Sequence, residues 1–479
     1  MRILHLSDSD GQGGAARSAW RLHRGLTALG QESAMLVRDK TSADSAVFTA
    51  RLEFSSAAKK HLAHLKCVEN HWIKSHRTEI SNTWFSVPAA GYDLSRNPHV
   101  LAAEVLNLHW VTGLLSPPAL ARLQQLGRPV FWTLHDQRPF TGGCHFSAGC
   151  RGYEQSCADC PQLSPDSPPL AAAGLRESLH CLNARKLTVV CPSRWLADCA
   201  HRSALFSQTR IETIPYGIET QVFQPIPKPE ARRQLGLDPG AVCLLFGADN
   251  PREKRKGFAE LCAVFHNALA DGWFREAVAS GKIKVLCFGD SRPQVENFGI
   301  PVTSLGRVET DAQLVRIYSA ASVFLLPSLE DNLPNTLLEA MACGTPAIGF
   351  EIGGVPDLIT PQETGLMAPI GDIPRFAELL VTLAQNESAL QQMSDHCARL
   401  IPSRFTLEIQ ARRYLELYQP ALAEKSSHPC RRLPVSSSPL LLPSPAFTKT
   451  FQSVIPLADQ ARRVARWQKL KRLARGKFD

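Results

Sequence analysis

Short apolar runs alternate with helical patterns over the first 350 residues of the chain. Apolar runs of about four to eight residues that end at turn residues are typical of parallel strands buried on both faces. Amphipathic patterns such as 14–30 and 311–321 lie between most of these runs and predict helices. The alternation predicts an α/β fold with two Rossmann-like domains that face each other across a cleft. The predicted strands are 2–7, 33–38, 104–109, 129–135, 187–193 and 211–217, followed by 242–247, 283–289, 321–328 and 345–350.

The chain of 479 residues is too long for one ordinary core, and breaks in the pattern indicate where it divides. Since ligands of such sheets bind at the carboxyl ends of the strands, polar residues just after strands are the candidates for a site. The expected parts are a first Rossmann-like domain (1–218), a linker (219–240), a second Rossmann-like domain (241–402), a further helix (403–420), a Ser/Pro-rich linker (421–450) and a basic tail (451–479).

The net charge of +9 belongs to the end of the chain, because residues 421–479 hold twelve Lys/Arg and three Asp/Glu. Within this part, residues 426–450 are rich in Ser and Pro and predict a disordered linker. Beyond them, apolar residues recur at three- and four-residue steps among eight Lys/Arg between 462 and 477. Such a helix would bind an anionic membrane surface. The alternative is a solvated or disordered tail. A nucleic-acid partner is not expected.

The sequence has no run of about 18 apolar residues that would indicate a transmembrane helix. Its first residues enter a strand pattern without the layout of a signal peptide. We therefore expect a cytoplasmic location, where the 14 cysteines are mostly thiols or metal ligands. Four cysteines fall close together in the loop 142–163, and they predict either a structural zinc site or unmetallated thiols with an occasional disulfide. These four are Cys144, Cys150, Cys157 and Cys160.

The segment 321–350 contains the most informative pattern of the chain. A strand ends at Pro327–Ser328, and a helix that carries Glu339 begins at Pro334 or Asn335. The N-terminus of a helix offers unpaired N–H groups and partial positive charge, which suit a diphosphate. Glu339 could accept hydrogen bonds from ribose hydroxyls, and Asp331 could meet a second polyol. The alternative is that Asp331 and Asn335 only cap the helix and Glu339 lies on a solvated face.

Residues 327–359, "PSLEDNLPNTLLEAMACGTPAIGFEIGGVPDLI", resemble the donor-site segment of GT4-type retaining glycosyltransferases of the GT-B fold. The resemblance covers roughly residues 1–418, and it implies that the helix 403–420 crosses back to the first domain. In the family two glutamates are separated by seven intervening residues. Here Glu339 matches the second, which binds the ribose, while Asp331 stands in place of the first near the transferred sugar, with Glu330 as a neighbouring substitute. The matching donor-binding residues in this segment are Asn332, Leu333 and Thr336.

Other segments agree with this resemblance. Gly13 and Gly14 match the glycine-rich turn after the first strand, where a Cβ would block the diphosphate or the acceptor. Lys256 matches the lysine that neutralises the leaving phosphate. The arginine that usually follows Gly247 is absent, so Arg252 or Arg255 would replace it. Residues near the nucleotide base would be Arg307 and Val308.

Two predicted strands of the first domain end in polar residues. "NLHW" places His109 and "TLHD" places His135 and Asp136 at strand ends, which predicts that they face the cleft. His135 matches the histidine that contacts the donor sugar in related enzymes, and His109 would lie on the acceptor side. The alternative is that a histidine at a strand end is a structural residue. The pattern from "TLHD" through the four cysteines closely resembles a branch linked to bacterial exopolysaccharide, including colanic-acid-type pathways.

The resemblance implies a retaining hexosyltransferase with a UDP- or GDP-sugar donor and a lipid-linked saccharide acceptor, acting in cell-surface polysaccharide biosynthesis. The residues expected to act in catalysis are His135, Asp136, Lys256 and Asp331. Positive charge at the diphosphate would come from Lys256 and the helix end, so no metal or other cofactor is expected in catalysis. Two alternatives remain: a non-catalytic scaffold of a polysaccharide assembly complex, and another GT-B enzyme such as a nucleotide-sugar epimerase.

Overall fold

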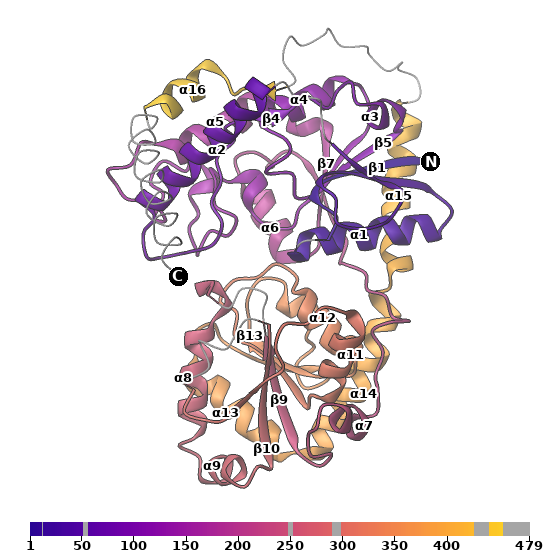
Figure 1. The fold of residues 1–479 in the computed structure, drawn as a ribbon, viewed down its shortest axis with the longest axis vertical. Helices are drawn as coiled ribbons and strands as arrows, with labels where there is room; N and C mark the ends of the chain where they lie inside the picture. Colours follow the sequence, from indigo (N-terminus) through magenta and orange to yellow (C-terminus); the bar gives the residue numbers. More distant parts are fainter. Residues whose placement is uncertain (12, 51–55, 248–251, 290–297, 426–439, 454–479) are drawn as a thin grey trace, which may run out of the picture.

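The computed structural model describes residues 1–11, 13–50, 56–247, 252–289, 298–425 and 440–453 (Figure 1). It contains two parallel sheets, one from each half of the chain, and this confirms the predicted fold class. In the described part of the chain, no helix is both long and apolar enough to cross a membrane. The predicted basic helix of the tail falls almost entirely within 454–479, outside the described residues.

The first sheet has seven parallel strands in the order β3-β2-β1-β5-β6-β7-β8. The strands are β1 (Arg2–Ser9), β2 (Glu32–Asp39), β3 (Val47–Thr49), β5 (Val105–Leu108), β6 (Val130–Thr133), β7 (Leu187–Cys191) and β8 (Arg210–Thr213). The helices of this domain are α1 (Gly13–Ala28), α2 (Ser56–His76), α3 (Pro98–Ala102), α4 (Pro117–Gln125), α5 (Leu170–Cys181) and α6 (Arg194–Arg202).

Helices cover both faces of this sheet because successive strand residues point to opposite sides. Ile3 and Val105 pack with α1 and with α15 (Leu407–Lys425), whereas their neighbours Leu4 and Leu106 belong to the apolar cluster that includes α2, α4 and α5. The central strands β5 and β6 are therefore buried along their whole length, in agreement with the apolar runs seen in the sequence.

The second sheet has six parallel strands in the order β11-β10-β9-β12-β13-β14. The strands are β9 (Val242–Gly247), β10 (Ile283–Phe288), β11 (Val302–Ser304), β12 (Val323–Leu326), β13 (Ala347–Phe350) and β14 (Gly365–Ala368). Its helices are α7 (Lys228–Gln234), α8 (Phe258–Ala268), α9 (Gly272–Ala279), α11 (Asp311–Ala320), α12 (Asn335–Ala342), α13 (Ile373–Gln385) and α14 (Glu387–Arg404).

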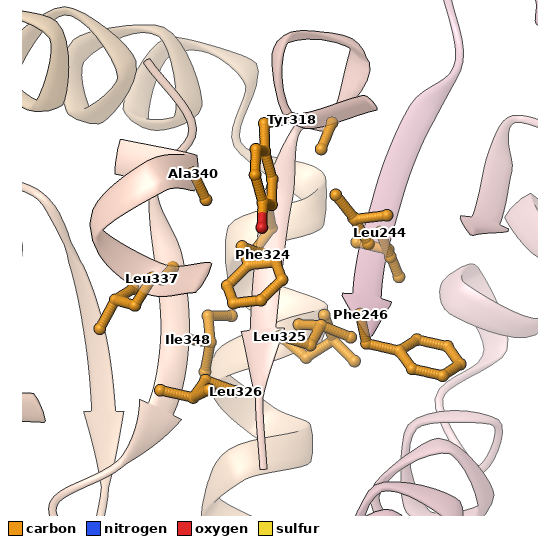
Figure 2. Close-up of a cluster of buried hydrophobic side chains, with 14 of the residues drawn as sticks. Leu244, Phe246, Tyr318, Phe324, Leu325, Leu326, Leu337, Ala340 and Ile348 are labelled. Carbon is orange, nitrogen blue, oxygen red and sulfur yellow. The ribbon is translucent and has the colours of Figure 1, made fainter. Parts of the chain in front are cut away.

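The centre of this second core fixes the end of β12 and the start of α12. Figure 2 shows Phe324, Leu325 and Leu326 of β12 among side chains from β9, β13, α11 and α12. All four residues of β12 are buried, and the buried residues of α12 include Leu337, Leu338 and Ala340. Close packing on both sides of this short loop leaves the segment between β12 and α12 little freedom.

The chain returns to the first domain at α15, as the resemblance implied, and α15 runs through to Lys425 (Figure 1). The hydroxyls of Tyr414 and Tyr418 bond to Thr133 and Asn107 of the first sheet, at 2.9 and 2.8 Å. These buried bonds attach α15 to the strands that carry His109 and His135.

The structure differs from the expected linker over residues 440–450. β15 (Leu440–Leu441) pairs with β4 (Gly91–Tyr92), and α16 (Pro445–Gln452) packs on α5. The physical reason is local: Ser444 caps α16, and Phe447 and Phe451, four residues apart, are both buried. The linker was predicted from the high content of Ser and Pro, and this prediction did not take the apolar pair into account.

Candidate functional site

A cavity of about 370 Å³ lies between the two domains at the carboxyl ends of both sheets. In each sheet the strand order reverses between two central strands, β1 and β5 in the first and β9 and β12 in the second. Such switch points are where open α/β sheets bind ligands. The cavity is lined by residues that follow these four strands, including Gly13, Gly14, Trp110, Gly247, Asp331, Asn332, Leu333, Asn335 and Thr336.

Two helices, one from each domain, begin at this cavity. Gly13 and Gly14 at the start of α1 and Asn335 and Thr336 at the start of α12 line it. The two helix ends touch, since Asn335 Nδ2 donates to the Gly14 carbonyl at 3.1 Å. Gly13 has φ of +83°, and a Cβ at Gly14 would stand 3.2 Å from Asn335 Nδ2, so larger residues fit poorly at both positions. No side chain at Pro334 caps α12. Unpaired N–H groups at the start of α12 can thus meet an anion, and the start of α1 lines the same cavity.

Two cations from the second domain line the same cavity. Lys256 and Arg255 belong to a short 3₁₀ turn (Lys254–Lys256), which Gly257 ends with φ of +69°. A Cβ at Gly257 would lie 1.8 Å from the Pro327 carbonyl oxygen, so the glycine allows this turn to pack against the end of β12. Lys256 is thereby held beside the β12–α12 loop. Arg252, the other arginine considered for the missing family position, is exposed and does not line the cavity.

Asp331 forms ion pairs with both Lys256 and Arg255. Its Oδ2 lies 2.7 Å from Lys256 Nζ and 3.5 Å from Arg255 Nη1. Burial alone would raise the pKa of Asp331, but Lys256 and Arg255 outweigh burial and hold that pKa below its ordinary value. Asp331 is therefore ionised and paired, which makes it a poor proton acceptor and a good hydrogen-bond acceptor. Its neighbour Glu330 points elsewhere and accepts from the backbone of Ser147 and Ala148 in the cysteine-containing loop.

Glu339 does not line the cavity, although the sequence predicts a role on the ribose. Its Oε1 lies 3.0 Å from Arg21 Nη2 and 3.3 Å from Arg17 Nε, and its Oε2 accepts from the Tyr318 hydroxyl at 3.2 Å. Both arginines come from α1 of the other domain. Glu339 can thus reach a ribose only where a hydroxyl competes for these oxygen atoms or α1 moves. The ribose role stays a prediction.

His109 is buried in the sheet rather than exposed on an acceptor face. It is 2% exposed and hydrogen-bonded on both sides, to His5 at 2.9 Å and to His135 at 3.0 Å. It lines a small cavity of about 40 Å³ within the first domain but not the cavity between the domains. The strand-end position suggested a cleft-facing residue, but β5 lies between β1 and β6, and the neighbouring strands enclose its end.

His135 and Asp136 do line the cavity between the domains, and both already have partners. Burial lowers the pKa of His135 to about 4, so the ring is neutral near pH 7. Asp136 accepts from His145 Nδ1 at 2.6 Å, from Trp110 Nε1 at 2.8 Å and from the Arg138 backbone at 3.0 Å. Burial would raise the pKa of Asp136, yet His145 and these bonds lower it. Both residues therefore suit the orientation of a ligand better than proton transfer.

The four cysteines of the loop 142–163 lie near one another without forming a metal site in this structure. No group of three or more His, Cys, Asp or Glu side chains in the described ranges is arranged to hold a metal ion. Burial and the neighbouring thiols raise the pKa of Cys144 and Cys160, and burial raises that of Cys157 to about 11. Bound zinc would require deprotonated thiols and a change in their arrangement. The zinc site stays a prediction.

Arg307 and Val308 do not line the cavity, and Arg307 is exposed. Other residues of the site were missed by the sequence analysis. Arg21 is fully buried against the second domain, whereas charged residues of an amphipathic helix usually lie on its solvated face. Tyr216 lines the cavity, and its position at the end of the predicted strand 211–217 was the available signal. Trp84 is 63% exposed, and its ring centroid lies 5.4 Å from that of Trp110, which lines the cavity.

Comparison with known proteins assigns the second domain. Residues 241–386 match the family described as Glycosyl transferases group 1. The second domain is a glycosyl transferases group 1 domain. This range contains β9, the Lys256 turn, β12 and α12, so the family segment supplies the cations and one of the two helix ends at the cavity.

Two curated relatives and one solved structure extend this comparison. D-inositol 3-phosphate glycosyltransferase of Acidothermus cellulolyticus is 27% identical over 47% of this chain and 51% of its own. The colanic acid biosynthesis glycosyl transferase WcaC of Escherichia coli is 27% identical over 52% of this chain and 59% of its own. The chain thus spans about half the length of the curated relatives it matches. HepE of Anabaena, solved with UDP-glucose, has a TM-score of 0.57 at 14% identity over 87% of this chain and 99% of its own, a likeness of fold alone.

Proposed function

We propose that the protein is a retaining glycosyltransferase that moves a hexose from a nucleotide sugar to a saccharide acceptor in polysaccharide biosynthesis. One observation carries this proposal: the N-termini of α1 and α12 and the side chains of Lys256 and Arg255 converge on one cavity between the domains. This arrangement suits a diphosphate, which needs N–H donors and positive charge. HepE, of similar fold, was solved with UDP-glucose, and this supports a donor of the UDP type.

In this proposal the protein positions the donor and neutralises charge. As the bond between the sugar and the diphosphate breaks, negative charge grows on the leaving phosphate, where Lys256 and the two helix ends stabilise it. A phosphate oxygen takes the proton of the acceptor hydroxyl, which attacks from the face that the leaving group vacates. Each carboxylate among the described residues that line the cavity already has a partner that makes it a poor nucleophile: Asp331 is bound to Lys256, Glu253 to Arg255 and Asp136 to His145. No divalent metal is needed, because the chain itself supplies positive charge.

The acceptor would enter from the side of Trp84 and Trp110. The aromatic faces of these residues can pack against the C–H groups of a sugar ring, because an aromatic face carries partial negative charge. A lipid-linked acceptor, and contact of the basic tail with an anionic inner membrane, belong to this proposal. WcaC, whose name places it in colanic acid biosynthesis, supports a pathway of cell-surface polysaccharide.

A non-catalytic scaffold is the second candidate. It is favoured by the fact that charged residues expected to bind the donor are already in ion pairs with other residues of the protein. Lys256 is paired with Asp331, and Glu339 is paired with Arg21. The deciding experiment incubates the full chain with a panel of UDP- and GDP-sugars, alone and with a membrane extract, and detects products by mass spectrometry. The wild-type enzyme should release nucleotide from the donor slowly without the extract and faster with it. The Lys256→Ala variant should release nucleotide in neither case. Donor binding without any turnover would favour the scaffold, and absence of both would contradict the proposal.

A further inference from the structure

Three histidines, one on β1 and two just after β5 and β6, form a continuous row that ends at a tyrosine in the cavity between the domains. His5 Nδ1 lies 2.9 Å from His109 Nε2, and His109 Nδ1 lies 3.0 Å from His135 Nε2. His135 Nδ1 lies 2.8 Å from the hydroxyl of Tyr216. His5, His109 and Tyr216 are 0, 2 and 5% exposed, whereas His135 is partly exposed. Of its members, His135 and Tyr216 line the cavity.

Each histidine of the row is neutral near pH 7. Burial lowers the pKa of His5 and His109 well below the ordinary value and that of His135 to about 4. A neutral imidazole carries one N–H group and one bare nitrogen. Because each internal contact joins two ring nitrogens, one must be protonated and the other bare. The row can therefore run in only two directions, with all protons on Nδ1 or all on Nε2.

The buried end of the row decides between these directions. Among the described residues, Nε2 of His5 has no hydrogen-bond partner. If the protons stood on Nε2, His5 would bury an N–H group without an acceptor, and if they stood on Nδ1, it would bury only a bare nitrogen. Orphaned N–H donors are the rarer defect in the backbones of folded proteins, and we apply the same preference to this ring. The protons then stand on Nδ1, and His135 donates to the oxygen of Tyr216.

This direction leaves the Tyr216 hydroxyl hydrogen available to a ligand. Within the described part of the chain, His135 is the hydrogen-bond partner found for this hydroxyl, and it uses the oxygen. Asp136 and Asp331 line the same cavity, and the carboxylate of Asp331 is paired with Lys256. A neutral hydroxyl that can donate a hydrogen bond suits an oxygen of a sugar, whereas a diphosphate is better matched by the positive charge of Lys256 and Arg255.

We propose that the Tyr216 hydroxyl donates a hydrogen bond to an oxygen of the transferred sugar, and that His135, His109 and His5 hold it in this orientation. The inference rests on the proposed function, since it requires a nucleotide sugar in the cavity. Tyr216 contacts the sugar, while His109 and His5 are positioning residues that act through His135.

Calorimetry with UDP and with UDP-glucose tests the contact in the full-length protein. Tyr216→Phe removes the hydroxyl and keeps the ring, so it should bind UDP as the wild type does and UDP-glucose about three- to tenfold more weakly, as expected for one hydrogen bond. Tyr414→Phe is the matched control, because it also loses a buried hydroxyl bond, to Thr133, but does not line the cavity. It should change neither affinity.

Each other outcome has a separate meaning. Wild-type affinity of Tyr216→Phe for UDP-glucose would overturn the inference and leave the proposed function standing. An equal loss for UDP and UDP-glucose would move the contact to the nucleotide and overturn the sugar assignment. If the wild type binds neither UDP nor GDP nor their sugars, both the proposed function and the inference fail.

Nitrogen NMR of histidine-labelled protein tests the row itself, because long-range couplings distinguish the two tautomers. His5, His109 and His135 should each carry the proton on Nδ1 at pH 7.5. Protonation of His135 on Nε2 would show that Tyr216 donates to the histidine and would overturn the proposed orientation. A purely structural row would share one common tautomer as well, so the loss of UDP-glucose affinity in Tyr216→Phe is the result that links the row to the ligand.

Discussion

Arg21 of α1 and Glu339 of α12 join the two domains through a buried ion pair, with 3.0 Å between Nη2 and Oε1. Arg21 also donates to Glu219 at 2.8 Å and to Asn335 at 3.2 Å, and its guanidinium lies over the ring of Phe223. Its side chain is fully buried. A guanidinium removed from water is tolerated only where carboxylates and amides satisfy it, and here they come from the linker and from the second domain.

Removal of Arg21 should therefore destabilise the protein strongly. Arg21→Leu leaves the buried Glu339 with the longer contact to Arg17 and removes the 2.8 Å partner of the half-buried Glu219, and we expect a loss of about 3–5 kcal/mol in urea denaturation. Arg24→Leu on the same helix is the control, since Arg24 is exposed and should change stability by less than about 0.5 kcal/mol. A double-mutant cycle with Glu339→Gln should give a coupling energy above about 0.5 kcal/mol, and a coupling near zero would show that the pair does not hold the domains.

Lys256 and Glu339 should both matter for the donor. Lys256→Ala and Glu339→Gln are each expected to weaken nucleotide-sugar binding at least tenfold, or about 1.4 kcal/mol, in calorimetry. Lys254→Ala is the matched control, because Lys254 belongs to the same turn but is exposed and does not line the cavity. Unchanged affinity in both test variants would remove these residues from the donor site.

Glu69 should make stability depend on pH. Burial raises its pKa from the ordinary 4.5 to about 7, although it accepts from the Val87 backbone at 2.9 Å. The unfolded chain ionises above pH 4.5 and the folded protein only near 7, so stability falls between these values by about 3 kcal/mol and then stays level. Glu69→Gln keeps the acceptor without the charge. It should match the wild type at pH 4 and exceed its stability at pH 8 in chemical denaturation. Parallel pH profiles would contradict the expectation.

The four loop cysteines yield a metal prediction. If they bind zinc, freshly purified protein prepared without chelators should carry about one equivalent, and Cys157→Ser/Cys160→Ser should lose it. Cys67→Ser, an exposed cysteine outside the loop, should keep it. Less than a tenth of an equivalent in the wild type would rule the zinc site out and leave four thiols, as the structure has them.

The basic tail should bind anionic membranes. Since α16 packs on the first domain, the deletion should begin after it, at residue 454, and leave Phe447 and Phe451 in place. The shortened protein should sediment less with anionic vesicles at low salt and hydrolyse donor as before. Added salt should weaken binding of the full chain, because about 1 kcal/mol per basic residue near the surface is electrostatic. Equal sedimentation of both proteins would show that the tail is no anchor.

The sequence by itself determined the fold and much of the cavity wall. Continuous apolar runs can be strands only where both faces are covered, so the two parallel sheets could be predicted. Parallel strands place all their carboxyl ends on one edge, and for this reason Gly13, Gly14, Lys256 and the segment 331–336 could be expected together. The structure finds these residues on one cavity.

Only the tertiary structure decided how the polar groups are partnered. Arg21 and Glu339 are 318 residues apart, and their contact requires two domains docked in one orientation. The histidine row requires β1, β5 and β6 side by side in one register, which placed His109 inside the sheet instead of on an acceptor face. The hydrophobic effect is not directional, so the local pattern of apolar residues is enough to predict which segments are buried. Hydrogen bonds and ion pairs require particular atoms to lie about 3 Å apart, and these distances exist only after the chain has packed.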